Sequence, residues 1–573
     1  MPRTKLLPLA VLASSLACTP PAGAPSLALT AVVAPHASQP VVVTLVVDQL
    51  AAWVARERLV ELPPDGGFAR LRREGTWVVS MRYEHAVTDT APGHSALYTG
   101  AAPTVSGIFA NEVLTPDGKP ESILRDAESH LVTSDGVQPR ASSSLAALRS
   151  ETLADRLRTE HPDAVILSLS LKDRGALFAG GHHPTASVWF DTTDNRFVTS
   201  TAVANALPTW AIAGLTSALA KAEASTWTPL DAAWIERHAA TPDAQPGEGD
   251  LPGFGVVFPH LLAGAKRPSL AFRTSPFADE VLLDLAVSAL DAEGGGKHTT
   301  LLAVSLSAND YIGHTFGPDS WEAWDEIARL DRTLARFFSA LDARFGPDGY
   351  SVLLTGDHGT NPMPEVGRHR FCDGPGADPW KRACDAAHRV LPGELSASLY
   401  ASANAALGAG DWVIGVSDPY VYLSAGARAL DPTRRAKLDA ALRATLLAYP
   451  GVVSAYPIAS VPTACPPFAD ESIEALVCRS VAPAVRERGA EFYLVLGPGS
   501  FFDPTVIVGK GTSHGSPYLY DRTVPLLVRA PGRVAAGRVV DMATFNAFVD
   551  TAASLLGVSP PHDAVTGGSI TLP

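Results

Sequence analysis

The sequence predicts an α/β protein in which a mostly parallel central sheet is covered by helices on both faces and interrupted by insertions. Segments with strand character alternate with segments of helical periodicity, an order that builds parallel sheets from successive β-α-β units. The first strand candidate, Val41–Val47, is a continuous β-branched run, which is typical of a strand buried on both faces. The 46% hydrophobic and 18% charged content belongs to a globular chain.

The next elements follow this alternation in order. Phe68–Glu74 predicts a short helix, and Glu151–Thr159 predicts a helix that leads into the strand Ala164–Leu171. Ala278–Ala292 has helical periodicity and leads into the strand Thr299–Ser305.

The alternation continues to the end of the chain. Trp321–Phe345 predicts a long amphipathic helix that feeds the strand Tyr350–Leu354. Val524–Val528 predicts a further strand and Thr544–Leu556 the last helix.

We expect a single domain over residues 40–570 with two insertions. The first, about 187–277, contains a hairpin at Ser187–Ser200 and a linker rich in Pro and Gly. The second, about 362–509, carries all four cysteines that follow Cys18. These are Cys372, Cys384, Cys465 and Cys478.

The cysteines favour disulfides. Two local pairs would each close a short loop and stabilise it by roughly 3 kcal/mol on the chain-entropy model, although four cysteines allow three connectivities. No C-x-x-C motif occurs, which argues against a structural zinc ribbon.

Residues 1–25 are predicted to be a targeting signal. A basic start at Arg3 and Lys5 precedes the apolar stretch Leu6–Ala17, which is too short to span a bilayer. Ser15–Cys18 resembles a lipoprotein box, and cleavage by an ordinary signal peptidase is the alternative. Either route predicts a periplasmic, cell-envelope or secreted protein, lipid-anchored at Cys18 in the first case. We expect no transmembrane segment and a monomer.

The charge balance excludes one class of partner. The formal net charge is −14, whereas nucleic-acid backbones are bound by Lys- and Arg-rich surfaces. Nucleic acid is therefore not expected as a bulk partner. A phosphorylated small molecule is compatible with this charge, because it needs only a local cluster of cations or metal.

Six Asp and His residues in short, separated motifs predict a metal centre. Carboxylate oxygen and imidazole nitrogen are ligands that suit zinc and similar divalent ions, and a carboxylate-rich double site suits two metals ~4 Å apart that act on a phosphoryl group. Three of the acids follow predicted strands, where α/β sheets bind ligands. The six residues are Asp48, Asp310, His314, Asp357, His358 and His514.

Thr90 is the candidate nucleophile. It lies in the stretch Thr88–Gly100, where Pro92 fits the first turn of a helix. The Thr90 hydroxyl would then lie near a helix N-terminus, which favours a phosphate, and a metal-bound hydroxyl could act as a nucleophile. Taken alone, an N-cap threonine is the simpler interpretation.

As a set, these motifs resemble the alkaline phosphatase superfamily, specifically the exported bacterial alkaline phosphatases with a threonine nucleophile. The nucleotide pyrophosphatase/phosphodiesterase branch shares the pattern T-x-T-x-P-x-H, here Thr88 to His94. The resemblance implies an alkaline phosphatase-like fold with the insertions near the active site, a covalent phosphothreonine and two zinc ions. It implies one zinc held by Asp48, Thr90, Asp357 and His358 and another held by Asp310, His314 and His514.

Lys172 and Arg174 decide the expected substrate class. At an extended strand end, residues two apart point the same way, and two cations would favour a dianionic phosphate monoester over a monoanionic diester. The family's threonine-type monoesterases carry this K-x-R pattern. Asn111 resembles the family asparagine that hydrogen-bonds a phosphate oxygen.

Three other functions remain open from the sequence. A phosphodiesterase or nucleotide pyrophosphatase on the same fold is the nearest. Gly511–Gly515 also fits G-x-S-x-G with Val506–Val508 as the preceding strand, so a serine hydrolase using Ser513 is a second. A non-catalytic phosphate- or metal-binding envelope protein is the third.

Overall fold

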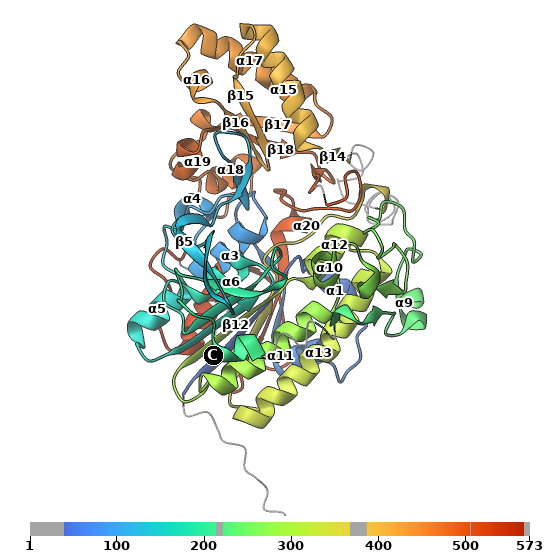
Figure 1. Cartoon of the computed structure of the whole chain (residues 1–573). Coiled ribbons are helices and arrows are strands. Elements are labelled where there is room, and N and C mark those ends of the chain that lie inside the picture. Colours follow the sequence, from blue (N-terminus) through green and yellow to red (C-terminus); the bar gives the residue numbers. More distant parts are fainter. Residues whose placement is uncertain (1–38, 214–219, 221, 367–386, 505, 566–573) are drawn as a thin grey trace, which may run out of the picture.

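An 11-stranded sheet forms the centre of the computed structural model, which describes residues 39–213, 220, 222–366, 387–504 and 506–565 (Figure 1). The strand order is β21-β2-β20-β13-β1-β12-β7-β8-β9-β5-β6. In chain order the strands are β1 (Val41–Val47), β2 (Thr76–Arg82), β5 (Arg125–Thr133), β6 (Gly136–Ser143), β7 (Val165–Ser170), β8 (Ala186–Asp191), β9 (Arg196–Ser200), β12 (Thr300–Leu306), β13 (Ser351–Thr355), β20 (Thr523–Arg529) and β21 (Arg538–Thr544).

The middle of the sheet is parallel and its flanks are largely antiparallel. Strands β13, β1, β12, β7 and β8 pair in parallel, whereas β20 runs antiparallel to β13 and to β2, and β9 runs antiparallel to β8. The predicted α/β class is confirmed, and the sheet as a whole is mixed. Its parallel middle is the part that carries the candidate ligands.

Strand β1 shows why helices cover both faces. All seven of its residues are buried, and alternate side chains enter two separate cores, Val43 and Leu45 on one face and Val42 and Val46 on the other. The helices that pack on the first face are α1 (Ala52–Arg58), α2 (Gly67–Glu74), α10 (Pro268–Arg273), α11 (Phe277–Ala292), α12 (Ala308–Phe316) and α13 (Trp321–Phe345). Those on the second are α3 (Thr90–Thr99), α5 (Leu153–Glu160), α6 (Asp173–Gly180) and α21 (Asn546–Leu556).

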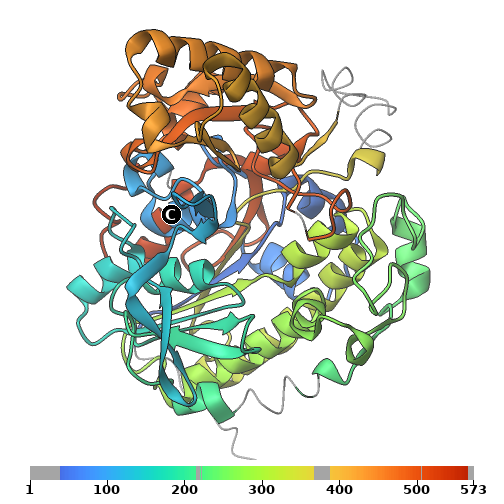
Figure 2. The same cartoon turned by 45° about the horizontal axis from the view of Figure 1, so that its top comes forward.

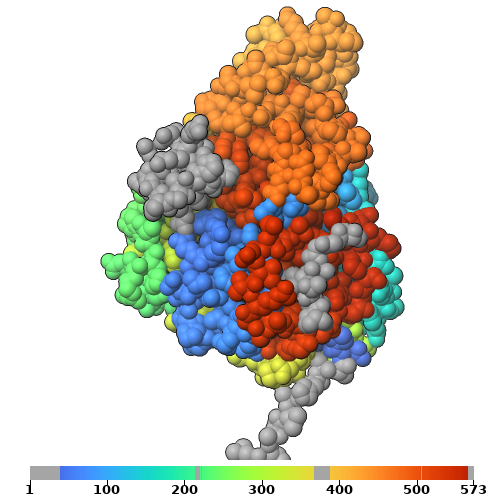
Figure 3. All heavy atoms as spheres, turned by 180° about the vertical axis from the view of Figure 1, so that it is seen from behind, coloured from blue at the N-terminus to red at the C-terminus, as the bar shows by residue number. Residues whose placement is uncertain are grey.

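A separate module rises above the carboxyl ends of the central strands. Its four-stranded sheet has the order β15-β16-β18-β17 and its own apolar core, and it projects from one end of the molecule (Figures 2 and 3). Its elements are α15 (Pro392–Leu407), β15 (Val413–Ser417), β16 (Tyr420–Leu423), α16 (Ala425–Arg428), α17 (Pro432–Ala448), β17 (Val452–Pro457) and β18 (Ala490–Leu496).

The first predicted insertion is not wholly separate from the sheet. The expected hairpin is β8 and β9, and β8 pairs in parallel with β7, so the hairpin extends the central sheet. Short elements fill the rest of this region: α7 (Thr209–Ala213), β10 (Thr226–Trp227), α9 (Ala232–His238) and β11 (His260–Leu261). The division into one domain with two insertions stays a prediction.

One of the two local cysteine pairs is a disulfide. Cys465 and Cys478 are joined, with their Cα atoms 5.5 Å apart, while Cys372 and Cys384 lie outside the described residues, as does the predicted targeting signal. Across the described ranges, no helix is both long and apolar enough to cross a membrane.

Candidate metal centre and active site

Three neighbouring strands deliver the three candidate acids. Asp48 directly follows β1, Asp310 lies in the first turn of α12 after β12, and Asp357 follows β13. Since β13, β1 and β12 are adjacent and parallel, their carboxyl ends place these acids side by side. All three side chains are buried, a costly position for carboxylates without cationic partners.

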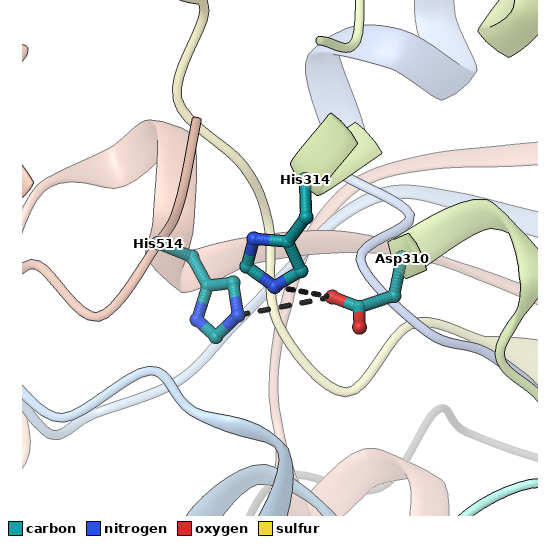
Figure 4. Close-up of side chains that lie close together, drawn as sticks. All are labelled: Asp310, His314 and His514. Atoms are coloured by element: carbon teal, nitrogen blue, oxygen red, sulfur yellow. Dashed lines mark ion pairs between the residues drawn. The ribbon is translucent and has the colours of Figure 1, made fainter. Parts of the chain in front are cut away.

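The first ligand group joins helix α12 to a distant loop. Asp310 and His314, one turn apart on α12, meet His514, and both imidazole rings direct Nε2 at the Asp310 carboxylate (Figure 4). The Asp310 Oδ1 atom lies 3.2 Å from His314 Nε2 and 3.8 Å from His514 Nε2. One ligand atom from each residue falls within 4.8 Å of the others.

The second group has the same chemistry. His358 Nε2 lies 3.3 Å from Asp48 Oδ1 and 3.5 Å from Asp357 Oδ2, and these three residues also offer ligand atoms within 4.8 Å of one another. The rings of His358 and His514 are stacked with centroids 3.7 Å apart. The two groups are therefore neighbours.

The histidines are oriented as metal ligands are. In each, Nδ1 is engaged by a backbone carbonyl, which favours a proton on Nδ1, so that Nε2 can coordinate an ion lying between it and the carboxylates. The carbonyls belong to Thr512 for His314, Gly359 for His358 and Thr88 for His514, at 2.8, 2.9 and 2.9 Å. Carboxylate oxygens and Nε2 atoms that face one another fit a pair of zinc-type ions.

Thr90 lies beside the second ligand group and contacts Lys172. It is the first residue of α3, after Asp89 at the N-cap position, so Thr90 is not itself the N-cap. Its buried hydroxyl oxygen lies 3.5 Å from His358 Nε2 and 3.3 Å from Lys172 Nζ. The predicted position near a helix N-terminus is observed.

Lys172 bridges the two groups. Its Nζ lies 2.6 Å from Asp48 Oδ2 and 2.6 Å from Asp310 Oδ2. Burial lowers the pKa of Lys172, but attraction by Asp310 and Asp48 outweighs burial and raises the pKa above its usual value. Lys172 is therefore a cation throughout the neutral and mildly alkaline range.

The expectation of an extended strand end at Lys172 and Arg174 was wrong. Strand β7 stops at Ser170, Lys172 is the N-cap residue of α6, and Arg174 lies in the first turn of that helix. Lys172 has extended backbone angles, and the helix begins at the next residue, Asp173. Arg174 nevertheless lines the cleft in front of His314 and His514.

Asn111 contacts the start of the nucleophile helix. Its Oδ1 accepts a hydrogen bond of 2.8 Å from the backbone N–H of Ala91, and Asn111 lines the same cleft as Arg174. The structure thus brings Lys172 to the Thr90 hydroxyl and Asn111 to the first turn of the same helix, while Arg174 lines the adjoining cleft.

Gln49 is a site residue that the sequence did not reveal. Its side-chain amide donates to Asp310 Oδ1 at 2.8 Å, and its backbone N–H donates to Asp357 Oδ1 at 3.1 Å. Gln49 has φ of 67°, a left-handed conformation that costs energy for a residue with a side chain. The one available signal was its position directly after Asp48.

Two further side chains support the ligands. His94 Nδ1 lies 3.1 Å from Asp357 Oδ2 and His94 Nε2 lies 2.9 Å from Ser305 Oγ, while Asp89 Oδ1 lies 3.2 Å from His514 Nδ1. His94 belongs to the T-x-T-x-P-x-H stretch, so spacing could have identified it as part of the site.

The structural context for a serine hydrolase is missing. A nucleophile elbow needs a strand before the serine and a helix directly after it. Residues 506–508 form no strand, and Ser513 is followed by irregular chain up to α20 (Leu519–Arg522). The expected strand Val506–Val508 was therefore wrong.

Comparisons with known proteins agree with this geometry. A family model described as type I phosphodiesterase / nucleotide pyrophosphatase matches residues 42–373. The alkaline phosphatase PhoV of Synechococcus elongatus is 34% identical over 348 residues, which is 58% of this chain and 61% of PhoV. The alkaline phosphatase PhoK of Sphingomonas sp is 29% identical over 521 residues, 88% of this chain and 87% of PhoK.

A solved structure matches most of the fold. The crystal structure of wild-type alkaline phosphatase PafA covers 93% of this chain and 98% of its own, with a TM-score of 0.78 at 26% identity. The match therefore extends over the central sheet, its helices and the module above them.

Proposed function

Because the chain belongs to the type I phosphodiesterase / nucleotide pyrophosphatase family of the alkaline phosphatase superfamily, we propose that this hydrolase cleaves phosphate monoesters at a two-zinc site through a covalent phosphothreonine on Thr90. The observation that carries the proposal is the position of the Thr90 hydroxyl oxygen. It lies 3.5 Å from His358 Nε2, which belongs to one group of metal-type ligands, and 3.3 Å from Lys172 Nζ, which contacts one carboxylate of each group.

The ligands divide into two half-sites. Thr90 and the group of Asp48, Asp357 and His358 would hold one ion, and the group of Asp310, His314 and His514 would hold the other. Bound zinc would lower the pKa of a coordinated hydroxyl or water and neutralise charge on the departing oxygen. The Nε2 atoms already face the carboxylates, so little rearrangement is needed to bind metal.

The chain's own residues place the phosphate. Thr90 Oγ attacks phosphorus and becomes the phosphoryl carrier, and water later releases inorganic phosphate. Lys172 and Arg174 supply positive charge to the non-bridging oxygens, and the Asn111 amide offers a hydrogen-bond donor beside the helix N-terminus.

Lys172 and Arg174 favour a monoester over a diester. A monoester carries two negative charges that both cations can bind, whereas a diester carries one charge and a second organic group. Phosphodiester or nucleotide pyrophosphate cleavage is the alternative, and the family model's own description names that activity.

The cellular setting follows from the same proposal. We place the enzyme outside the cytoplasm, in the periplasm, on the cell envelope or secreted, with small phosphate esters as its partners. Lipid anchoring at Cys18 and a monomeric state are further parts of the proposal.

Hydrolysis of matched substrates tests this function. The zinc-loaded protein should cleave 4-nitrophenyl phosphate with a higher kcat/KM than methyl 4-nitrophenyl phosphate, and a chelator should abolish both activities until zinc is returned. A preference for the diester would contradict the roles of Lys172 and Arg174. Ester cleavage that survives chelation would contradict the metal mechanism.

A further inference from the structure

A cleft of about 530 Å³ opens in front of the metal groups. Its floor is formed by His314, His514 and Arg174, and one wall is the hairpin of β3 (Glu112–Leu114) and β4 (Pro120–Ser122). The roof comes from the module, where Pro392, Ser396 and Tyr400 on α15 and Ile414–Ser417 on β15 face the cleft. This volume suits a small organic molecule.

The alcohol half of the substrate belongs in this cleft, an assignment that rests on the proposed function. An in-line displacement expels the leaving oxygen on the side of phosphorus opposite to Thr90. His314 and His514, from the half-site that does not include Thr90, are the ligands that line the cleft. The group attached to the leaving oxygen therefore extends toward the module.

Apolar side chains make up much of the cleft. Leu114 stands on the hairpin, Ile414 and Val416 on β15, and Phe502 on the strand β19 (Phe501–Phe502). Tyr400 is 40% exposed, and its hydroxyl donates to the carbonyl of Ile414, so its ring is held beside the opening. Such a surface favours contact with the hydrocarbon part of a leaving group over contact with a strongly hydrated group.

Carboxyl groups are the most numerous ionisable groups around this apolar surface. Apart from Arg174 and the two histidines, the ionisable side chains among the described lining residues are Tyr400 and four carboxyl groups: Asp89, Glu112, Asp418 and Asp503. Asp89 already contacts His514, and Asp503 accepts a hydrogen bond from Gly509. Burial and repulsion by Asp89 raise the pKa of Asp418 well above its usual range, so Asp418 adds little charge.

Glu112 is the exposed carboxylate of this set. We propose that the cleft selects a leaving group that bears an ammonium charge on a carbon skeleton, so that phosphate monoesters of amino alcohols are preferred over esters of hydroxy acids. Glu112 attracts the cation at the wall of the cleft, and the Tyr400 ring offers a face to it. The same carboxylate repels an anionic leaving group.

A neighbouring pocket would suit the opposite charge. It lies on the other side of Arg174, has a volume of about 300 Å³, and is lined by Arg125 and Arg140. Arg140 already forms ion pairs with Asp191 and Asp194, so it is less available to bind an anionic ligand. A substrate that used this pocket would show a preference for anionic leaving groups, so the two pockets make opposite predictions.

Three esters of similar leaving-group size test the proposal. They are choline phosphate, its uncharged carbon analogue 3,3-dimethylbutyl phosphate, and the phosphate ester of 3-hydroxypropionate. The zinc-loaded enzyme and its Glu112→Gln and Glu112→Lys variants are compared by kcat/KM at low and high salt. Glu121→Lys is the matched control, because Glu121 pairs with Val113 on the same hairpin but does not line the cleft.

The ratio of kcat/KM for choline phosphate to that for the hydroxypropionate ester is the readout. Glu112→Lys should lower this ratio roughly three- to tenfold at low salt and less at high salt, because exposed charges are screened, while Glu121→Lys should leave it nearly unchanged. Equal ratios in all variants, or a wild-type preference for the hydroxypropionate ester, would overturn the inference. If the wild type also fails on 4-nitrophenyl phosphate, the proposed function itself fails.

Discussion

At the scale of single residues, Gln49 links the two ligand groups by hydrogen bonds. It contacts Asp310 through its side chain and Asp357 through its backbone. Gly313 on α12 makes room for it, since a Cβ there would lie 1.9 Å from Gln49 Oε1. Outer contacts of this kind orient carboxylate ligands and tune metal affinity.

Replacing Gln49 by Met should weaken zinc binding. Methionine keeps the length of the side chain but loses the donor to Asp310, and removing such outer partners typically lowers metal affinity roughly 10- to 100-fold. Titration with a competing zinc chelator measures the affinity directly. Gln138→Met on the edge strand β6 is the control, and equal zinc affinity in both variants would show that Gln49 does not position the ligands.

Lys172 should control the choice between monoester and diester. In a Lys172→Met variant we expect kcat/KM for 4-nitrophenyl phosphate to fall by about 10²-fold or more and the value for the methyl diester to fall much less, because the second phosphate charge loses its cation. The exposed Lys119→Met serves as the matched control. If both substrates lost activity equally, Lys172 would be a structural residue only.

Residue types and spacing indicated that Asp and His side chains from separate motifs meet in space, whereas their division into two groups came from the resemblance to the family. This prediction was possible because three of the acids follow strands, and the carboxyl ends of parallel strands lie at the same edge of a sheet. Gln49 could not be found in this way, since its role depends on a left-handed backbone and on the small size of Gly313. The position of Arg174 on a helix was missed because the K-x-R pattern fits a strand end equally well.

At the scale of elements, the segment between α9 and α10 carries a buried acid that is not one of the candidate metal ligands. Glu248 is 5% exposed. Burial, followed by repulsion from Glu322 and Asp243, raises the pKa of Glu248 to about 10. The folded protein therefore holds a neutral carboxyl where the unfolded chain, with a pKa near 4.5, ionises.

This acid should make the folded protein less stable as pH rises. Between the unfolded and folded pKa values the native state binds the extra proton, so the free energy of unfolding falls with increasing pH. Glu248→Gln removes the free-energy cost of keeping this carboxyl group protonated in the folded protein at high pH. The free energy of unfolding of the variant should therefore exceed that of the wild type by about 1–3 kcal/mol at pH 9 and by much less at pH 6.

Urea denaturation of the zinc-loaded proteins at the two pH values measures this difference. Glu236→Gln, an exposed substitution on α9, should change stability little at either pH. A gain for Glu248→Gln that was the same at pH 6 and pH 9 would mean that ionisation of Glu248 is not the cause.

Element boundaries followed from the sequence where local pattern decides them. Val41–Val47 and Trp321–Phe345 agree with β1 and α13 residue for residue, because a continuous buried run and a long amphipathic period leave little ambiguity. The pairing of β8 with β7 was not apparent, since partner choice at the edge of a sheet depends on long-range contacts.

At the scale of the whole molecule, the central sheet positions the candidate metal ligands and the module covers the cleft in front of them. The alternation of strands and helices predicted the central body, whereas the module's own four-stranded sheet was hidden within an expected insertion. Its contribution to the cleft depends on how α15 and β15 dock above β3 and β4, a tertiary relation without a local sequence pattern.

The proposed mechanism requires Thr90 to be the nucleophile within a two-zinc site. The decisive measurement is the kcat for 4-nitrophenyl phosphate of Thr90→Ala, taken together with the zinc content of the same sample. We predict that turnover is almost completely lost while zinc content stays close to that of the wild type, because six other side chains hold the ions. Near-wild-type turnover in Thr90→Ala would show that Thr90 is not the nucleophile.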